Sequence, residues 1–242
     1  MQSALYVALS AQVAMEKRLN TVANNVANVN TGGFRADEVK FEEIMSTTAK
    51  EAVSFASSGQ NFISRRSGPM NKTDNPLDVA IQGDGWFAFS APNGAIAYTR
   101  DGRMKMTENG ELQTLNGYPI LDAGGAPIAL DPRAGSPVIG RDGMIMQGDD
   151  QVGQIGLFNL NQGAKLTRFD NSGVFANSPG VPVEDFNANS IHQGFSEGSN
   201  VNPLLELTKL ISIQRSFESA ATATAETESS LMDAIRTLGP SS

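Results

Sequence analysis

The residues that could carry acid–base chemistry are few in this sequence. The chain has a single histidine, His192, in the segment Asn189–Gly194, whose composition is typical of a loop. A lone loop histidine in a chain without cysteine is more often a surface or hydrogen-bonding residue than a catalytic base. We therefore expect no catalytic residue here, and the protein is not predicted to be an enzyme.

Residues that could bind a metal ion are equally few. Zinc sites need several nitrogen or sulfur ligands, and the chain has no cysteine to provide them. Calcium loops need clustered acidic oxygens, but residues 101–105 (Asp-Gly-Arg-Met-Lys) carry basic side chains where an EF-hand loop has acids. The adjacent acids Asp149 and Asp150 are more typical of a turn. No metal and no cofactor is expected.

Two further motifs invite a chemical interpretation. Residues 83–85 (Gly-Asp-Gly) are glycine-rich, but they follow one predicted strand and enter another, so no helix N-terminus is present to bind phosphate. A catalytic pair of carboxylates for glycoside hydrolysis is not excluded, because the distance between two carboxylates in the fold cannot be read from the sequence. With 26 acidic residues some pair is always available, so this pattern has little weight. A periplasmic glycan-binding or glycan-cleaving protein is the alternative to a structural one.

Asparagines near the N-terminus form a more specific pattern. Asn20, Asn24 and Asn28 are four residues apart and share one ridge of a helix, with Asn25 and Asn30 beside it. Asparagine is a poor helix former, so this choice lowers helix stability. The ridge is either a solvated polar face or a set of carboxamides kept for hydrogen bonds to neighbouring chains. Glu, Lys and Gln would solvate a helix better, which favours the second interpretation.

Both ends of the chain are predicted to be helices with apolar residues at alternating steps of three and four. The first helix spans about 3–30, and the last begins after the capping residue Asn202 at Pro203. The apolar positions of the first are Leu5, Ala8, Met15, Leu19, Val22, Val26 and Val29. Those of the second are Leu207, Leu210, Phe217, Ala221, Leu231, Ile235 and Leu238. One pair of such helices still exposes apolar surface, which marks an interaction site.

The middle of the chain is predicted to be all-β. Asp-Gly and Asn-Gly dipeptides recur there and supply the positive backbone angles of two-residue hairpin turns. They lie at 84–85, 93–94, 101–102, 109–110, 116–117 and 142–143. The strands predicted around them are Leu77–Ile81, Trp86–Ser90, Ile96–Thr99, Met104–Thr107 and Ile155–Asn159. The pattern indicates a sandwich or an irregular barrel of short antiparallel strands.

The predicted fold class is therefore α+β. The N- and C-terminal helices pair as a coiled-coil-like helical domain, and the central domain is an antiparallel all-β domain. The predicted segments are an N-terminal helix of the assembly domain at 1–35, a linker or small irregular subdomain with one hairpin at 36–73, the β domain at 74–197 and the C-terminal helix at 198–242.

Composition excludes several classes of function. Against 18 basic residues stand 26 acidic ones, giving a net charge of -8, so the basic surface that neutralises nucleic-acid phosphates is missing. No apolar run approaches membrane-spanning length. Disulfides and thiolate chemistry are excluded by the absence of cysteine. Residues 4–11 are apolar without a preceding basic residue, so we expect no cleaved signal peptide.

Three sets of motifs resemble those of the rod, hook and hook-related axial proteins of the bacterial flagellum. The first is residues 23–35 (Ala-Asn-Asn-Val-Ala-Asn-Val-Asn-Thr-Gly-Gly-Phe-Arg). The second is residues 75–87 (Asn-Pro-Leu-Asp-Val-Ala-Ile-Gln-Gly-Asp-Gly-Trp-Phe) with 98–102 (Tyr-Thr-Arg-Asp-Gly). The third is residues 198–202 (Gly-Ser-Asn-Val-Asn) with 214–218 (Gln-Arg-Ser-Phe-Glu). The length and the opening segment are most similar to the proximal-rod members, and the distal-rod and hook proteins are the alternatives.

This resemblance implies a structural subunit of the proximal flagellar rod, required for motility. Such a subunit is exported by the flagellar type III apparatus and polymerises through its terminal helices into the periplasmic drive shaft that transmits torque. Its expected partners are other proximal and distal rod subunits, copies of itself and the export apparatus, with no small-molecule substrate. The expected assembly interface comprises Leu5, Met15, Leu19, Val22, Asn24, Asn25, Val26, Asn28, Leu207, Leu210, Gln214, Arg215, Phe217, Leu231, Ile235 and Leu238.

Overall fold

The computed structural model describes residues 2–40, 43–46, 53–56 and 60–238, and the chain divides into two units. The helical unit consists of Met1–Ala27, Asp37–Phe62 and Asn202–Ser242. The β unit consists of Asn28–Ala36 and Ile63–Val201. Each unit thus contains segments that are far apart in the sequence.

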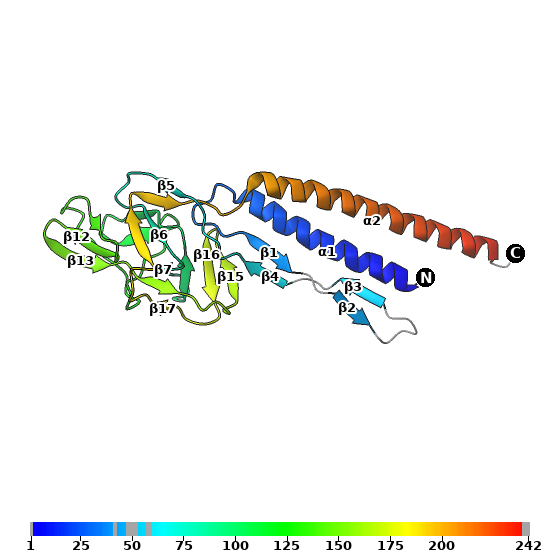
Figure 1. Ribbon diagram of the computed structural model, residues 1–242, viewed down its shortest axis with the longest axis horizontal. Coiled ribbons are helices and arrows are strands. Elements are labelled where there is room, and N and C mark those ends of the chain that lie inside the picture. The colour runs from blue at the N-terminus through cyan, green and yellow to red at the C-terminus, as the bar shows by residue number, and fades with distance from the viewer. Residues whose placement is uncertain (1, 41–42, 47–52, 57–59, 239–242) are drawn as a thin grey trace. The chain divides into compact units, whose positions relative to one another are not determined.

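Two long helices dominate the helical unit. Helix α1 spans Gln2–Ala27 and helix α2 spans Pro203–Leu238, and the two lie side by side (Figure 1). The predicted start of α2 is confirmed: the side chain of Asn202 accepts a hydrogen bond of 3.1 Å from the N–H of Leu205, and proline fills the first helical position. Helix α1 ends at Ala27, three residues before its predicted end.

Short strands complete the helical unit. Strand β1 (Asp37–Lys40) pairs with β4 (Gln60–Ile63), and β2 (Glu43–Ser46) pairs antiparallel with β3 (Val53–Ala56). Part of the predicted subdomain at 36–73 lies outside the described residues. The helices are therefore accompanied by strand pairs within the same unit.

The prediction that the two helices pair as a coiled coil is wrong. In such a pair the heptad positions of α2 would be covered by α1, but Leu207 is 46% exposed and Gln214 is exposed as well. Among the described side chains of α2, Glu206 is buried and Leu210, Ile213, Ala220, Ala221 and Thr224 are partly buried. This covered face overlaps the predicted seam at Leu210 and Ala221 but also includes Glu206, Ile213 and Ala220, because α2 has apolar residues on more than one side.

The β unit contains one larger sheet and several two- or three-stranded ones. The larger sheet has the order β15-β16-β8-β7-β14-β17, with antiparallel neighbours. Its strands are β15 (Leu166–Phe169), β16 (Gly173–Ala176), β8 (Ile96–Thr99), β7 (Trp86–Ser90), β14 (Leu157–Asn159) and β17 (Val181–Pro182). The smaller sheets are formed by β5 (Met70–Lys72) with β19 (Phe195–Glu197), β6 (Val79–Gln82) with β18 (Ser190–Gln193), β9 (Met104–Met106) with β10 (Leu112–Thr114), and β11 (Val138–Ile139) with β12 (Met144–Gln147) and β13 (Asp150–Gln154).

The predicted strands of the β unit correspond closely to observed ones. The predictions Trp86–Ser90 and Ile96–Thr99 coincide with β7 and β8. The apolar side chains of these strands enter a shared core with residues of the smaller sheets, such as Leu112 and Ile145, which are fully buried. Burial of this kind of side chain contributes about 1.5–3 kcal/mol each, so the core is the main source of stability in this unit.

Candidate functional site

A buried cluster of charges joins the two segments of the β unit. Glu197 in β19 accepts hydrogen bonds from two arginines, Arg35 and Arg100, each at 2.8 Å. The exposed fraction of all three side chains is 2% or less. A buried carboxylate with two guanidinium partners is well compensated, whereas any one of these groups alone would be costly to bury. The cluster therefore holds the segment that follows α1 onto the β unit.

Backbone hydrogen bonds reinforce this attachment. The N–H of Gly33 donates to the carbonyl oxygen of Glu197 at 2.8 Å. The N–H of Gly68 donates at 2.9 Å to Oε1 of Glu197, the carboxylate oxygen that also accepts from Arg35. Gly33 has a positive φ of 64°, and a Cβ there would lie 2.1 Å from the backbone nitrogen of Asp101. Only glycine fits this close approach, which explains the Gly-Gly-Phe-Arg segment.

Arg100 is fixed by further acceptors. Besides Glu197, its guanidinium donates to the carbonyl oxygens of Ile81, Gly83 and Gly85. Ile81 lies in β6, and Gly83 and Gly85 lie between β6 and β7, so the arginine joins the end of β6 to the segment that follows it. The glycine-rich segment 83–85 therefore binds a buried arginine. The prediction of a hairpin turn there is wrong, because β6 pairs with β18 and β7 pairs with β8 and β14, so the two strands that flank the segment are not paired with each other.

Burial lowers the pKa of both arginines in the cluster. The pKa of Arg35 falls to about 10 because desolvation disfavours the cation, and the nearby Glu197 offsets only part of this effect. The pKa of Arg100 is lowered for the same reason. A pKa of about 10 still lies above neutral pH, so the Arg35 guanidinium stays protonated there.

Arg35 is not fully paired. Its Nη2 atom binds Glu197, but Nε and Nη1 are buried and have no acceptor. The ring of Trp86 lies 5.8 Å from Cζ, close enough for a cation–π contact but not a substitute for an oxygen acceptor. A buried donor without an acceptor costs about 1–3 kcal/mol.

A second polar cluster lies at the end of α1 in the helical unit. The buried Asn25 donates to the carbonyl oxygen of Asp37 and to Glu206 of α2, and its side-chain oxygen accepts the N–H of Asp37. Asn24 donates to the carboxylate of Asp37 at 2.7 Å. Two members of the asparagine pattern therefore connect α1 to β1 and α2 within the chain.

One face of α2 is apolar and exposed. Leu204, Ile211 and Met232 are 75%, 51% and 64% exposed and are spaced by multiples of seven residues, and Leu207 lies beside them. Positions seven apart share a helix face. On α1, Leu9 and Val13 are exposed at a spacing of four. Exposed apolar side chains in rows of this kind mark a protein interaction surface.

The predicted interface residues fall into three groups. Val22 and Asn25 are buried, and Met15, Leu19, Val26, Asn28 and Leu210 are partly buried. Exposed side chains are those of Asn24, Leu207, Gln214, Arg215 and Phe217. The side chains of Leu5, Leu231, Ile235 and Leu238 lie outside the described part of the structure.

His192 lies in strand β18 and not in the predicted loop. Its Nε2 atom is 3.0 Å from Oε1 of Gln82 and 3.2 Å from Oγ of Ser190, so the hydrogen-bonding interpretation is confirmed. Among the described residues no group of three acidic or histidine side chains is arranged to hold a metal ion. No helix in the described ranges is long and apolar enough to cross a membrane.

Sequence reasoning missed Glu197, Arg100 and Glu206 as organising residues. All three side chains are buried. Arg100 pairs with Glu197 across 97 residues of sequence and Asn25 pairs with Glu206 across 181, so only the fold reveals these contacts.

Family models of flagellar proteins match three parts of the chain. They are described as "Flagella basal body rod protein" for residues 5–35, "Flagellar hook protein FlgE/F/G D1 domain" for residues 80–147 and "Flagellar basal body rod FlgEFG protein C-terminal" for residues 192–237. The first contains most of α1, the third contains most of α2, and the second lies within the β unit.

Full-length relatives agree with these matches. The chain is 54% identical to flagellar basal-body rod protein FlgF of Mesorhizobium japonicum and 47% identical to that of Rhizobium meliloti, each over 100% of both chains. It is 33% identical to flagellar basal-body rod protein FlgG of Bacillus subtilis, over 90% of this chain and 92% of that protein. The similarity thus extends over both units.

Proposed function

The chain belongs to the flagellar basal-body rod protein family and is a structural subunit of the rod, and we propose that it polymerises there through the exposed faces of its terminal helices. Its place is the flagellar basal body, it interacts with other rod components, and its role is in motility. Membership of a structural family implies that the protein is not an enzyme. The relatives with full-length similarity named FlgF agree with the proximal-rod character inferred from the motifs.

The exposed row on α2 carries the proposal. Leu204, Leu207 and Ile211 are spaced as i, i+3 and i+7, so they form one stripe along the outer side of the helix. Burying a leucine or isoleucine side chain contributes about 1.5–3 kcal/mol. Covering this stripe with a neighbouring helix therefore gives a contact that a monomer cannot make.

The geometry of such contacts favours a filament. The stripe on α2 and the exposed Leu9 and Val13 of α1 are different surfaces, so a contact between them joins unlike patches of two subunits. Contacts between unlike patches generate rings or open helical assemblies, in contrast to two-fold dimers. An open helical assembly is the form that a rod requires.

The finer parts of the proposal follow from this role. We infer that the neighbours are copies of this chain and the adjoining proximal and distal rod subunits, and that the assembly lies in the periplasm. We also infer export through the flagellar type III apparatus. Passage of an unfolded chain is compatible with a sequence that has no cysteine and forms no disulfide.

Charge substitution on the stripe tests the proposal. Ile211→Glu and Leu207→Glu, each introduced into cells that lack the wild-type chain, are expected to abolish swimming and to remove the subunit from isolated basal bodies. Ser212→Glu is the matched control, because Ser212 is exposed and lies about 100° around the helix from Ile211. The purified variants should have the same helix content as the wild type by circular dichroism. Normal swimming with both stripe variants would refute polymerisation through this face.

A further inference from the structure

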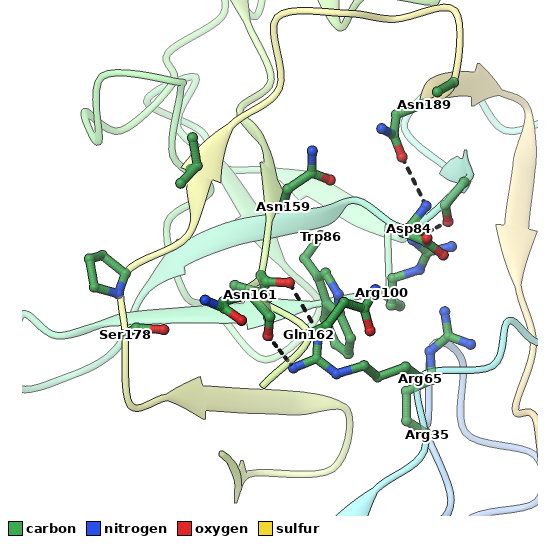
Figure 2. Close-up of a pocket in the computed structure, with 15 residues that line it drawn as sticks. Arg35, Arg65, Asp84, Trp86, Arg100, Asn159, Asn161, Gln162, Ser178 and Asn189 are labelled. Atoms are coloured by element: carbon green, nitrogen blue, oxygen red, sulfur yellow. Dashed lines mark hydrogen bonds between the residues drawn. The ribbon is translucent and has the colours of Figure 1, made fainter. Parts of the chain in front are cut away.

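A cleft of about 640 Å³ lies in the β unit beside strands β7, β14 and β17 (Figure 2). Its wall includes the side chains of three arginines, Arg35, Arg65 and Arg100, which come from three separate segments. Asp84 and the exposed Gln162 also line it. Basic side chains thus outnumber acidic ones in the wall of this cleft, although the whole chain has a net charge of -8.

Two of the three guanidinium groups are already occupied. Arg100 binds Glu197 and three carbonyl oxygens. Arg65 donates to the carbonyl oxygens of Leu160, Asn161 and Ala164, at 2.8 to 3.1 Å. Their roles are therefore structural.

Arg35 differs from these two because Nε and Nη1 have no acceptor although the side chain is only 2% exposed. These two atoms, together with the charge, suit a carboxylate, which accepts hydrogen bonds from a guanidinium in pairs. A neutral amide oxygen would accept the same hydrogen bonds, but they would be weaker than charge-assisted bonds to a carboxylate.

The chain itself contains a fitting carboxylate pair. The turn between β12 and β13 presents Asp149 and Asp150, both exposed, at one end of the β unit (Figure 1). No residue of the β11–β12–β13 sheet lines the cleft, so this turn does not fill the cleft of its own subunit. The other exposed acidic pair of this unit, Glu184 and Asp185, lines a separate hollow together with Arg141 and Asp142.

We propose that the cleft beside Arg35 binds the Asp149–Asp150 turn of a second copy of this chain. This proposal rests on the proposed polymerisation. It adds a contact between the β units of two subunits to the contact between their terminal helices. Because the cleft and the turn are different surfaces, the contact joins unlike patches and can repeat along a filament. Nε and Nη1 of Arg35 are covered in the free subunit, so binding requires a local adjustment of the cleft wall.

Trp86 provides a direct readout, because it lines the cleft and is the single tryptophan of the chain. The probe is a peptide of residues 146–151 (Met-Gln-Gly-Asp-Asp-Gln), acetylated and amidated, titrated into the full-length protein at low ionic strength. We expect a saturable change in Trp86 fluorescence that weakens with added salt. The same peptide with both aspartates replaced by asparagine should give no change.

Variants locate the binding. Arg35→Lys keeps a cation beside Glu197 but removes the spare donors, and it should weaken binding by about tenfold or more. Gln162→Glu places a negative charge in the cleft without touching Arg35, and it should also abolish binding. Gln60→Glu, in strand β4, makes the same charge change outside the cleft and should bind as the wild type does.

Three results would overturn the proposal: equal binding of the asparagine peptide, unchanged affinity in Gln162→Glu, or binding of inorganic sulfate as tight as that of the acidic peptide. The last result would make the cleft a site for free anions. If Arg35→Lys fails to fold, the Gln162→Glu result decides. The titration probes the cleft and does not depend on α2, so its failure leaves helix-mediated polymerisation standing, and the Ile211→Glu experiment tests that separately.

Discussion

Asn25 and Asp37 are joined by two reciprocal hydrogen bonds. The side-chain nitrogen of Asn25 donates to the carbonyl oxygen of Asp37 at 2.9 Å, and its side-chain oxygen accepts the N–H of Asp37 at 2.8 Å. A single carboxamide thus pairs with both backbone groups of one residue, as a neighbouring strand would. This arrangement gives β1 a defined position beside α1.

Replacing Asn25 by alanine should therefore loosen β1. The change leaves the backbone N–H and C=O of Asp37 without these partners and should cost about 1–3 kcal/mol locally. Faster hydrogen exchange at the amide of Asp37, measured by NMR or mass spectrometry, checks this. Asn20→Ala is the control, because Asn20 is exposed on the same helix and alanine is the better helix former. Equal protection in both variants would contradict the assigned role of Asn25.

Glu197→Gln should be strongly destabilising. Glutamine keeps the shape of the side chain but leaves the buried Arg35 and Arg100 without their countercharge, and breaking a buried ion pair in this way costs about 3–5 kcal/mol. Urea unfolding followed by the fluorescence of Trp86 measures the loss. The exposed Glu184→Gln should change stability by less than about 0.5 kcal/mol. An unshifted midpoint for Glu197→Gln would mean that the cluster does not hold the β unit together.

Alanine at Gly33 should cost more than alanine at Gly94. Both glycines have a positive φ, 64° and 77°, so each substitution incurs about 1–2 kcal/mol of backbone strain. A Cβ at Gly94 meets no atom within 4 Å, whereas one at Gly33 lies 2.1 Å from the nitrogen of Asp101. The difference between the two unfolding free energies isolates this close approach. Equal losses would show that backbone conformation alone requires glycine at position 33.

Asn189 should tolerate aspartate but not alanine. Its side-chain oxygen accepts the N–H groups of Asp84 and Gly85 at 2.8 and 3.1 Å. Aspartate keeps an acceptor at this position, while alanine leaves two donors unpaired and should cost about 1–3 kcal/mol. Thermal unfolding of the two variants ranks them. A less stable aspartate variant would indicate that the negative charge of Asp84 nearby outweighs the retained hydrogen bonds.

The parts of the fold that depend on local chemistry were predictable from the sequence. The positions of β7 and β8 follow from the turn at Asn93–Gly94 and from the apolar strands on either side, because turn residues and strand pattern act over a few residues. The same holds for the start of α2 at Pro203, where a capping asparagine and a proline act within one turn.

The parts that depend on distant pairing were not predictable. Strand β18 pairs with β6 although about a hundred residues separate them, which is why His192 was assigned to a loop. The heptad pattern of α2 is real, but it does not specify which of several apolar sides faces α1. The cluster around Glu197 joins Arg35 and Arg100 from different segments, and no local pattern marks such a partnership.

The division of the chain has a consequence for the order of folding. Most of the β unit is one continuous stretch, Ile63–Val201, whereas the helical unit needs α1 and α2 from opposite ends of the chain. Domains fold as units during vectorial synthesis or translocation. The β unit can therefore form while α2 is still emerging, and the helical unit closes only after residues beyond 202 are available. The surface that carries α2 is the last to form, so under the polymerisation proposed above self-association waits until the subunit is complete.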